Sequence, residues 1–412
     1  MTENNNNNRI QLSYSNLKSI NFSAFIHLDQ VELIDLSDNH LTQIERDTFI
    51  NCENLKRLFL PHNSINFVHD NAFNGLGNVQ TLNLSHNKIL YLGNSIFQPL
   101  TNIQNLYLSQ NIIAKLHPNV LLSNLTNLVT LGLSGLKLET LDQNIFENCL
   151  SLAELNLSSN KLKSLDKNLF ACLSKLKSLS VKNNLITNLP VDLFRNTKKL
   201  KFLNLRNNRL EVLDSSLFQN LNNLEELNLD NNQLSLLDKI LFQDLRKLET
   251  LRLDNNNLTR LEVGLFEALE SLAYLSISAN KIKHLGDGLF NGLNKLTILN
   301  LNDNQIESIE SMVFSDLSEV IDLSLAENRI EFFDEKAFKN LKYLESLDLR
   351  TNRLRNIKLE LFEKMERMIE IYLVNNPIET IEINQISKLK KIYIRIPFNK
   401  PKFNLKMYNY NI

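Results

Sequence analysis

Apolar residues recur along the chain in a fixed pattern of 24 residues, LxxLxLxxNxLxxLxxxxFxxL. The Asn of this pattern is the clearest marker of each unit. Successive markers are 24 residues apart, except where Leu136 takes the Asn position after a unit of 25, and Ser15 holds the first position. The pattern predicts about sixteen units, with marker residues at Asn39, Asn63, Asn87, Asn111, Asn160, Asn184, Asn208, Asn232, Asn256, Asn280, Asn304, Asn328, Asn352 and Asn376.

The spacing within a unit predicts its local structure. The last two leucines of LxxLxL are two residues apart, so both side chains face the same side of a short strand. The residues six, four and two positions before the marker face the other side, which is open to solvent. We expect the strands to stack in parallel, ~4.8 Å apart. The Asn amide both donates and accepts, so stacked copies satisfy the backbone groups of each turn.

A Phe stands ten residues after nearly every marker, and it fills the return path between strands. No unit buries a core of its own, so stability comes from contacts between neighbouring units. In the irregular stretch around Leu136, Gly135 is expected to supply a backbone conformation that the missing Asn no longer supports. The 25-residue unit also replaces its Phe by Leu121 and Leu122.

This repeat resembles the leucine-rich-repeat superfamily, specifically its typical 24-residue class, which includes Toll-like receptor ectodomains, Slit-type proteins and insect immune proteins. The resemblance implies an α/β repeat solenoid. Its horseshoe carries a parallel β-sheet on the concave face and irregular or short helical segments on the convex face. We expect an Asn-rich disordered segment over 1–9, the solenoid over 10–396 with a shortened last unit at Leu389, Ile392 and Ile394, and a basic tail over 397–412.

Composition agrees with this reading and limits the function. Gly (9) and Pro (7) are scarce among 412 residues, and no phosphate-binding glycine loop is present, so Asn must make the turns. The net charge of −1 hides a basic end, because seven basic residues and no acid follow Glu382. The remaining body is acidic and does not predict nucleic-acid binding.

The sequence offers no catalytic constellation, metal site or cofactor motif, so we expect a chain that is not an enzyme. His62 and His86 hold the same position in adjacent units, but a metal site would need a third ligand. Asp230 and Asp254 are also stacked neighbours. Their paired carboxylates indicate an acidic surface for a basic partner, or a solvated salt-bridged surface, rather than hydrolysis on an open ribbon.

The three cysteines do not indicate a compartment. Cys52 and Cys149 take apolar positions and are expected to be buried free thiols, too far apart for a disulfide. A bond between Cys149 and Cys172 is possible from their adjacent units but is disfavoured by their register. The chain shows no signal peptide, transmembrane run or cysteine-rich cap. The resemblance implies an extracellular or cell-surface protein, with a cytoplasmic scaffold as the alternative.

The open strand face is where the sequence stops repeating, and it is the expected binding surface. Exposed aromatic and arginine side chains are the types that anchor protein interfaces. We predict one partner-binding patch at Phe202, Arg206, Glu226, Asp230, Arg252, Asp254 and Tyr274. A second is predicted at Arg57, Phe59 and Tyr107. The expected partner is a protein ligand or receptor in recognition, adhesion or innate-immune signalling, with a glycan or a lipid-bearing ligand also open.

Overall fold

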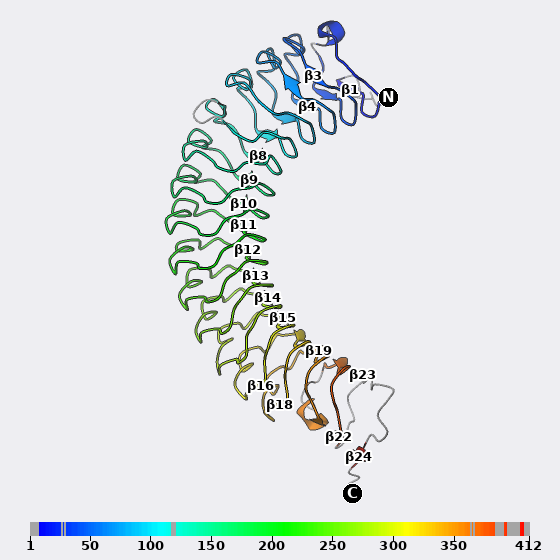
Figure 1. Cartoon of the computed structure of the whole chain (residues 1–412), viewed down its shortest axis with the longest axis vertical. Coiled ribbons are helices and arrows are strands. Elements are labelled where there is room, and N and C mark those ends of the chain that lie inside the picture. The colour runs from blue at the N-terminus through cyan, green and yellow to red at the C-terminus, as the bar shows by residue number, and fades with distance from the viewer. Residues whose placement is uncertain are drawn as a thin grey trace, which may run out of the picture. The chain divides into compact units, whose positions relative to one another are not determined.

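The computed structural model describes residues 8–25, 28, 30–116, 121–362, 365, 367–383, 391–393 and 404–407. The chain divides into two compact units, Met1–Asn204 and Leu205–Ile412. Each unit is a coil of short parallel strands joined by turns, and each has its strands on the concave side of its own bend (Figure 1). Among the described residues, no helix is both long and apolar enough to cross a membrane.

The first unit contains one continuous parallel ladder. Each strand pairs with the next at a shift of 24 residues, as in Leu58↔Leu82, and the shift is 25 between β7 and β8. The ladder strands are β1 (Arg9–Gln11), β2 (Leu33–Asp35), β4 (Arg57–Phe59), β6 (Thr81–Asn83), β7 (Asn105–Tyr107), β8 (Thr130–Gly132), β9 (Glu154–Asn156), β10 (Ser178–Ser180) and β11 (Phe202–Asn204). A short side ladder joins β3 (Gln43–Ile44) and β5 (Phe67–Val68), and a 3₁₀ turn covers Phe22–Phe25.

The second unit repeats this architecture. Its ladder strands are β12 (Glu226–Asn228), β13 (Thr250–Arg252), β14 (Tyr274–Ser276), β15 (Ile298–Asn300), β17 (Asp322–Ser324), β19 (Ser346–Asp348), β21 (Glu370–Tyr372) and β23 (Lys391–Tyr393). Side ladders join β16 (Ser308–Ile309) to β18 (Phe332–Phe333), and β20 (Asn356–Lys358) to β22 (Thr380–Ile383) and β24 (Asn404–Met407). A second 3₁₀ turn covers Leu359–Phe362.

The end of the second unit bears on two predictions. The shortened last repeat is confirmed, because β23 pairs with β21 at a shift of only 21 residues, as in Ile371↔Ile392. Its predicted neighbours Leu389 and Ile394 lie outside the described residues. So do most of the segments assigned to the Asn-rich start and the basic tail, whose boundaries stay predictions.

The predicted core is confirmed in both units. The leucine at the centre of each strand is buried, and the repeated Phe side chains are buried in a continuous row. Neighbouring rings in that row stack with centroids 6.4 Å apart for Phe170 and Phe194, and 6.0 Å apart for Phe266 and Phe290. Each such pair adds about 0.5–1.5 kcal/mol beyond the burial of its area. Leu121 and Leu122 are buried where the row lacks a Phe.

The marker Asn forms the ladder of amides that the sequence predicts. Asn232 is typical: its Oδ1 accepts the backbone N–H of Leu210 at 3.1 Å. Its Nδ2 donates to the carbonyl oxygens of Leu205, Leu229 and Asp230 at 3.1, 3.0 and 3.2 Å. Each Asn therefore ties its own turn to the turn before it. This explains how the coil turns without glycine.

The irregular unit around Leu136 corrects one expectation. Gly135 does have a positive φ of 69°, but so does the equivalent residue before every marker in the described chain, including His86 and Asn231. The missing Asn has a different consequence, because Lys137 also turns left-handed at φ 68°. The same happens after Ser15, where Asn16 has φ 56°. The unit is therefore changed one residue after the marker rather than at the glycine.

Candidate binding face

The open side of each strand ladder, which we call the strand face, carries the residues six, four and two positions before the marker. The middle residue of a strand points into the core, while its two neighbours are turned outward: Leu227 is buried between Glu226 and Asn228. The face is regular because every strand is only three residues long and keeps the same register. Its chemistry is therefore set by which side chains fill the three outward positions.

In the first unit, the predicted residues fall into two separate places. Arg57 and Phe59 lie on β4, and Tyr107 lies on β7, with Asn83 of β6 between Phe59 and Tyr107 in register. Arg57 is exposed, whereas Phe59 and Tyr107 are half-buried. Burial, then Glu154, raises the pKa of Tyr107. Phe202 lies on β11, the last strand of this unit, and is 44% exposed.

In the second unit, Arg252 and Tyr274 form a direct contact. The Arg252 guanidinium lies over the Tyr274 ring, 4.4 Å from its centroid, and Nη1 donates to the phenol oxygen at 3.3 Å. Both side chains are half-buried, and Glu226 shares the face at the same level as Thr250. We call Arg252 and Tyr274 the Arg–Tyr patch. The structure brings together these two predicted residues.

Asp230 and Asp254 take a different place from the one predicted. Asp230 is only 6% exposed, so the expectation that it faces solvent is wrong. Its Oδ1 accepts the backbone N–H of Asp254 at 2.9 Å. Asp254 continues the arrangement, since its Oδ1 accepts the Ser278 N–H at 2.7 Å and the Ser276 hydroxyl at 2.5 Å. These carboxylates therefore hold successive turns together.

The electrostatics of Asp230 follow from this burial. Burial raises the pKa of the Asp230 carboxyl, and the neighbouring Asp254 raises it further. The backbone N–H of Asp254 acts in the opposite direction, as do the guanidinium groups of Arg252 and Arg206. The predicted acidic surface for a basic partner is thus reduced, because one of its two carboxylates is enclosed by the ladder.

A second arginine and tyrosine pair occupies the far part of the same ladder. The Arg350 guanidinium lies 5.5 Å from the centroid of the Tyr372 ring. It also forms an ion pair with Asp348, with Nη2 and Oδ2 2.6 Å apart. The hydrogen bond from Asp348 raises the pKa of Arg350. These residues hold the same outward positions as the Arg–Tyr patch. That register was the available signal that they form a similar surface.

The histidine and cysteine predictions can also be placed. The imidazoles of His62 and His86 stack with centroids 4.2 Å apart, and burial, then His62, lowers the pKa of His86. Across the described ranges, no group of three or more His, Cys, Asp or Glu side chains is arranged to hold a metal. Cys52 and Cys149 are buried free thiols as predicted, and Cys172 is a free exposed thiol.

Comparison with known proteins agrees with this geometry. The leucine-rich-repeat family profile matches residues 8–65, 53–113, 126–186, 174–234, 198–258, 246–306 and 294–354. The chain belongs to the leucine-rich-repeat family. No curated protein matches the sequence.

Solved structures share the fold. A chain of the Drosophila Toll–Spatzle complex is 21% identical, with a TM-score of 0.73 over 89% of this chain and 53% of that chain. A leucine-rich-repeat protein of Leptospira interrogans is 26% identical, with a TM-score of 0.66 over 90% and 92% of the two chains. The Arabidopsis GASSHO1/SCHENGEN3 receptor kinase ectodomain, solved with CASPARIAN STRIP INTEGRITY FACTOR 2, is 23% identical, with a TM-score of 0.72 over 91% and 47%. This chain thus spans about half the length of the Toll-complex chain.

Proposed function

We propose that the chain is a non-enzymatic binding module that recognises a protein ligand on its strand face, with the Arg–Tyr patch as an anchor. The observation that carries this proposal is the placement of Arg252 over Tyr274 on an otherwise regular and open ladder. Arginine and tyrosine are enriched among the residues that contribute most to protein interfaces. The contact between them holds both side chains in place before a partner arrives, which lowers the entropy cost of binding.

The surrounding face supplies the rest of the proposed interface. Glu226 and Arg206 are the charged residues nearest in sequence that stay accessible, whereas Asp230 and Asp254 hold the scaffold. In the first unit, Arg57, Phe59 and Tyr107 form the second proposed contact region, and Phe202 offers an exposed ring. Half-buried aromatic rings on a rigid sheet suit a protein ligand, because they combine contact area with little rotamer freedom.

The proposed setting is recognition outside the cell or at its surface, of the kind seen in innate immunity and development. Its support is the shared fold with a chain of the Toll–Spatzle complex and with a receptor kinase ectodomain solved with a bound factor. The alternative is an intracellular scaffold of the same fold. Three free thiols suit this alternative, since reducing compartments keep cysteines unpaired. The location of the endogenous protein, detected by antibody with and without permeabilising the cell, separates the two.

The binding proposal is tested by quantitative affinity capture with three forms of the full chain. The forms are the unchanged protein, the double variant Arg252→Ala/Tyr274→Ala, and Arg260→Ala as a control. Arg260 is an exposed arginine outside the strand face, at the position four residues after a marker. A genuine partner is captured by the unchanged and control proteins and depleted with the double variant. If every captured protein binds the double variant equally well, the Arg–Tyr patch is not the anchor.

A further inference from the structure

The last two turns of the first unit carry an unusual concentration of positive charge. Residues 161–204 contain ten basic and two acidic residues, a formal charge of +8 in a chain whose total is −1. Several of these basic side chains lie off the strand face, in the segments that connect β9 to β10 and β10 to β11. We call five exposed members the basic band: Lys167, Lys175, Lys177, Arg195 and Lys199.

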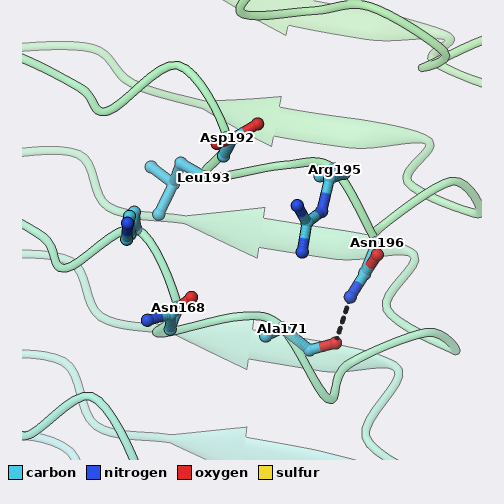
Figure 2. A pocket seen from close by; sticks show the side chains of 7 residues that line it. Asn168, Ala171, Asp192, Leu193, Arg195 and Asn196 are labelled. Carbon is cyan, nitrogen blue, oxygen red and sulfur yellow. Dashed lines mark hydrogen bonds between the residues drawn. The ribbon is translucent and has the colours of Figure 1, made fainter.

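One part of the band lines a hollow of about 250 Å³. Lys167 and Asn168 come from one turn, and Asp192, Arg195 and Asn196 come from the next (Figure 2). Asn196 fixes the two turns together, because its Nδ2 donates to the carbonyl oxygen of Ala171 at 2.8 Å. In the described part of the chain, neither the Lys167 ammonium nor the Arg195 guanidinium makes an ion pair. Two cations therefore stand at a rigid hollow with their charge unmatched.

The other part of the band follows directly along the chain. Lys199 comes three residues after Asn196 and holds the same position, nine residues before the marker, that Lys175 holds in the preceding turn. The two lysines are thus stacked on turns ~4.8 Å apart. Lys177 stands beside them, and its carbonyl oxygen accepts the Lys201 N–H at 2.8 Å. Among the described residues, no carboxylate lies within ion-pair distance of Lys175, Lys177 or Lys199.

Like charges at this spacing repel one another, so the bare band destabilises the fold slightly and is relieved by a bound anion. The hollow also indicates which kind of anion. It contains Asp192 and two side-chain amides beside its cations. A polymer with a phosphate or sulfate on every residue would set a negative charge against Asp192. A peptide can instead offer its carboxylates to Arg195 and the lysines, and its main-chain N–H groups to Asp192 and the amides.

We infer that the basic band is a second interaction surface, separate from the strand face, that binds an acidic segment of a polypeptide. A carboxylate of the segment pairs with Arg195 in the hollow. Further acidic residues then follow the lysines Lys175, Lys199 and Lys177 toward the edge of the ladder. Neither the strand face nor the Arg–Tyr patch takes part in this contact, so the inference stands apart from the proposed function.

The test measures fluorescence polarisation of labelled twelve-residue peptides with the full chain. The probe alternates Glu with Ser and Gly, and a matched peptide carries Gln in place of Glu. The variants are Lys175→Gln/Lys199→Gln, Arg195→Gln, and Lys161→Gln/Lys163→Gln as a control. The control removes two exposed lysines of the same stretch that lie outside the band. Circular dichroism checks that all four proteins fold alike.

We expect the Glu peptide to bind at least about tenfold more tightly than the Gln peptide at low salt. We expect the band variants to lose about tenfold in affinity, and the control and Arg252→Ala less than about twofold. Equal losses in band and control variants would show unspecific attraction to positive charge and overturn the site. Tighter, band-dependent binding of heparin or of a single-stranded oligonucleotide than of the Glu peptide would overturn the assignment to a polypeptide.

Discussion

The Oδ1 of Asp230 accepts the backbone N–H of Asp254 at 2.9 Å, across the step between two successive turns. Asp254 does the same for Ser278 one turn later, at 2.7 Å. The position two residues before the marker therefore has a second use besides presenting side chains to a partner. In these turns it carries the turn-to-turn contact along the edge of the face.

Replacement of Asp230 separates its hydrogen bond from its charge. Asp230→Ala leaves the Asp254 N–H without its acceptor and is expected to lower the free energy of unfolding by about 1–2 kcal/mol. Asp230→Asn keeps an acceptor oxygen and removes a buried charge, so its stability at pH 7 should equal or exceed that of the unchanged protein. Urea denaturation followed by circular dichroism measures both. An Ala variant as stable as the unchanged protein would contradict the structural role.

The same comparison has a predicted pH dependence. Burial raises the pKa of Asp230 in the folded state above its value of 3.8 in a free chain. The folded state therefore binds the proton more readily, and ionisation of Asp230 costs stability at neutral pH. As pH falls through the folded-state pKa toward 3.8, the unchanged protein should gain stability relative to Asp230→Asn. A constant difference between the two proteins from pH 7 to pH 4 would refute the raised pKa.

The amide ladder predicts a large effect at a marker residue. Asn232→Ala removes one accepted and three donated hydrogen bonds between buried groups, and is expected to cost about 2–4 kcal/mol. Asn188→Ala, at an exposed position outside the ladder, serves as the control and should change stability by less than about 0.5 kcal/mol. Chemical denaturation of both variants gives the comparison. Equal effects at the two positions would count against the ladder as the source of turn stability.

The irregular unit makes opposite predictions for two neighbouring positions. Gly135→Ala places a Cβ 2.6 Å from the Gln110 side chain at a φ of 69°, and should lower stability by about 1 kcal/mol. Lys137→Gly relieves a non-glycine residue at φ 68° and should be neutral or slightly stabilising, although glycine elsewhere destabilises. Thermal unfolding of the two variants tests this directly. The account fails if Lys137→Gly is the more harmful change.

Thiol reactivity should distinguish the three cysteines. Burial raises the pKa of Cys52 to about 11 and that of Cys149 to about 12, so both stay protonated and shielded near neutral pH. Cys172 is exposed. Titration with a disulfide reagent at pH 8 should therefore detect one thiol in the folded protein and three after denaturation. Rapid reaction of two or three thiols in the folded state would show that the buried positions open.

The strands, the core and the turns follow from the sequence, because each depends on the spacing within one unit. The strand at Glu226–Asn228 begins six residues before Asn232, and Phe266 and Phe290 stack where the pattern predicts. Their positions need only a constant register. Alternation on a strand fixes which side a residue faces, and 24-residue periodicity fixes its neighbour.

The chemistry of the face was less predictable for a physical reason. A residue two positions before the marker has the same spacing whether it meets solvent, as Arg206 does, or caps the next turn, as Asp230 does. Its burial depends on which side chains fill the neighbouring turns. Likewise, the contact between Arg252 and Tyr274 depends on rotamers, and the basic band depends on turn segments without strand periodicity. Register alone does not determine these features.

The central claim is that the strand face binds a protein ligand through Arg252 and Tyr274. Its most direct test is the dissociation constant of a purified partner, obtained by the capture experiment, for the unchanged chain, Arg252→Ala/Tyr274→Ala and Arg260→Ala. Loss of two anchors of this kind should weaken binding by about tenfold or more, with circular dichroism unchanged and Arg260→Ala equal to the unchanged chain. An unchanged dissociation constant for the folded double variant would contradict the claim.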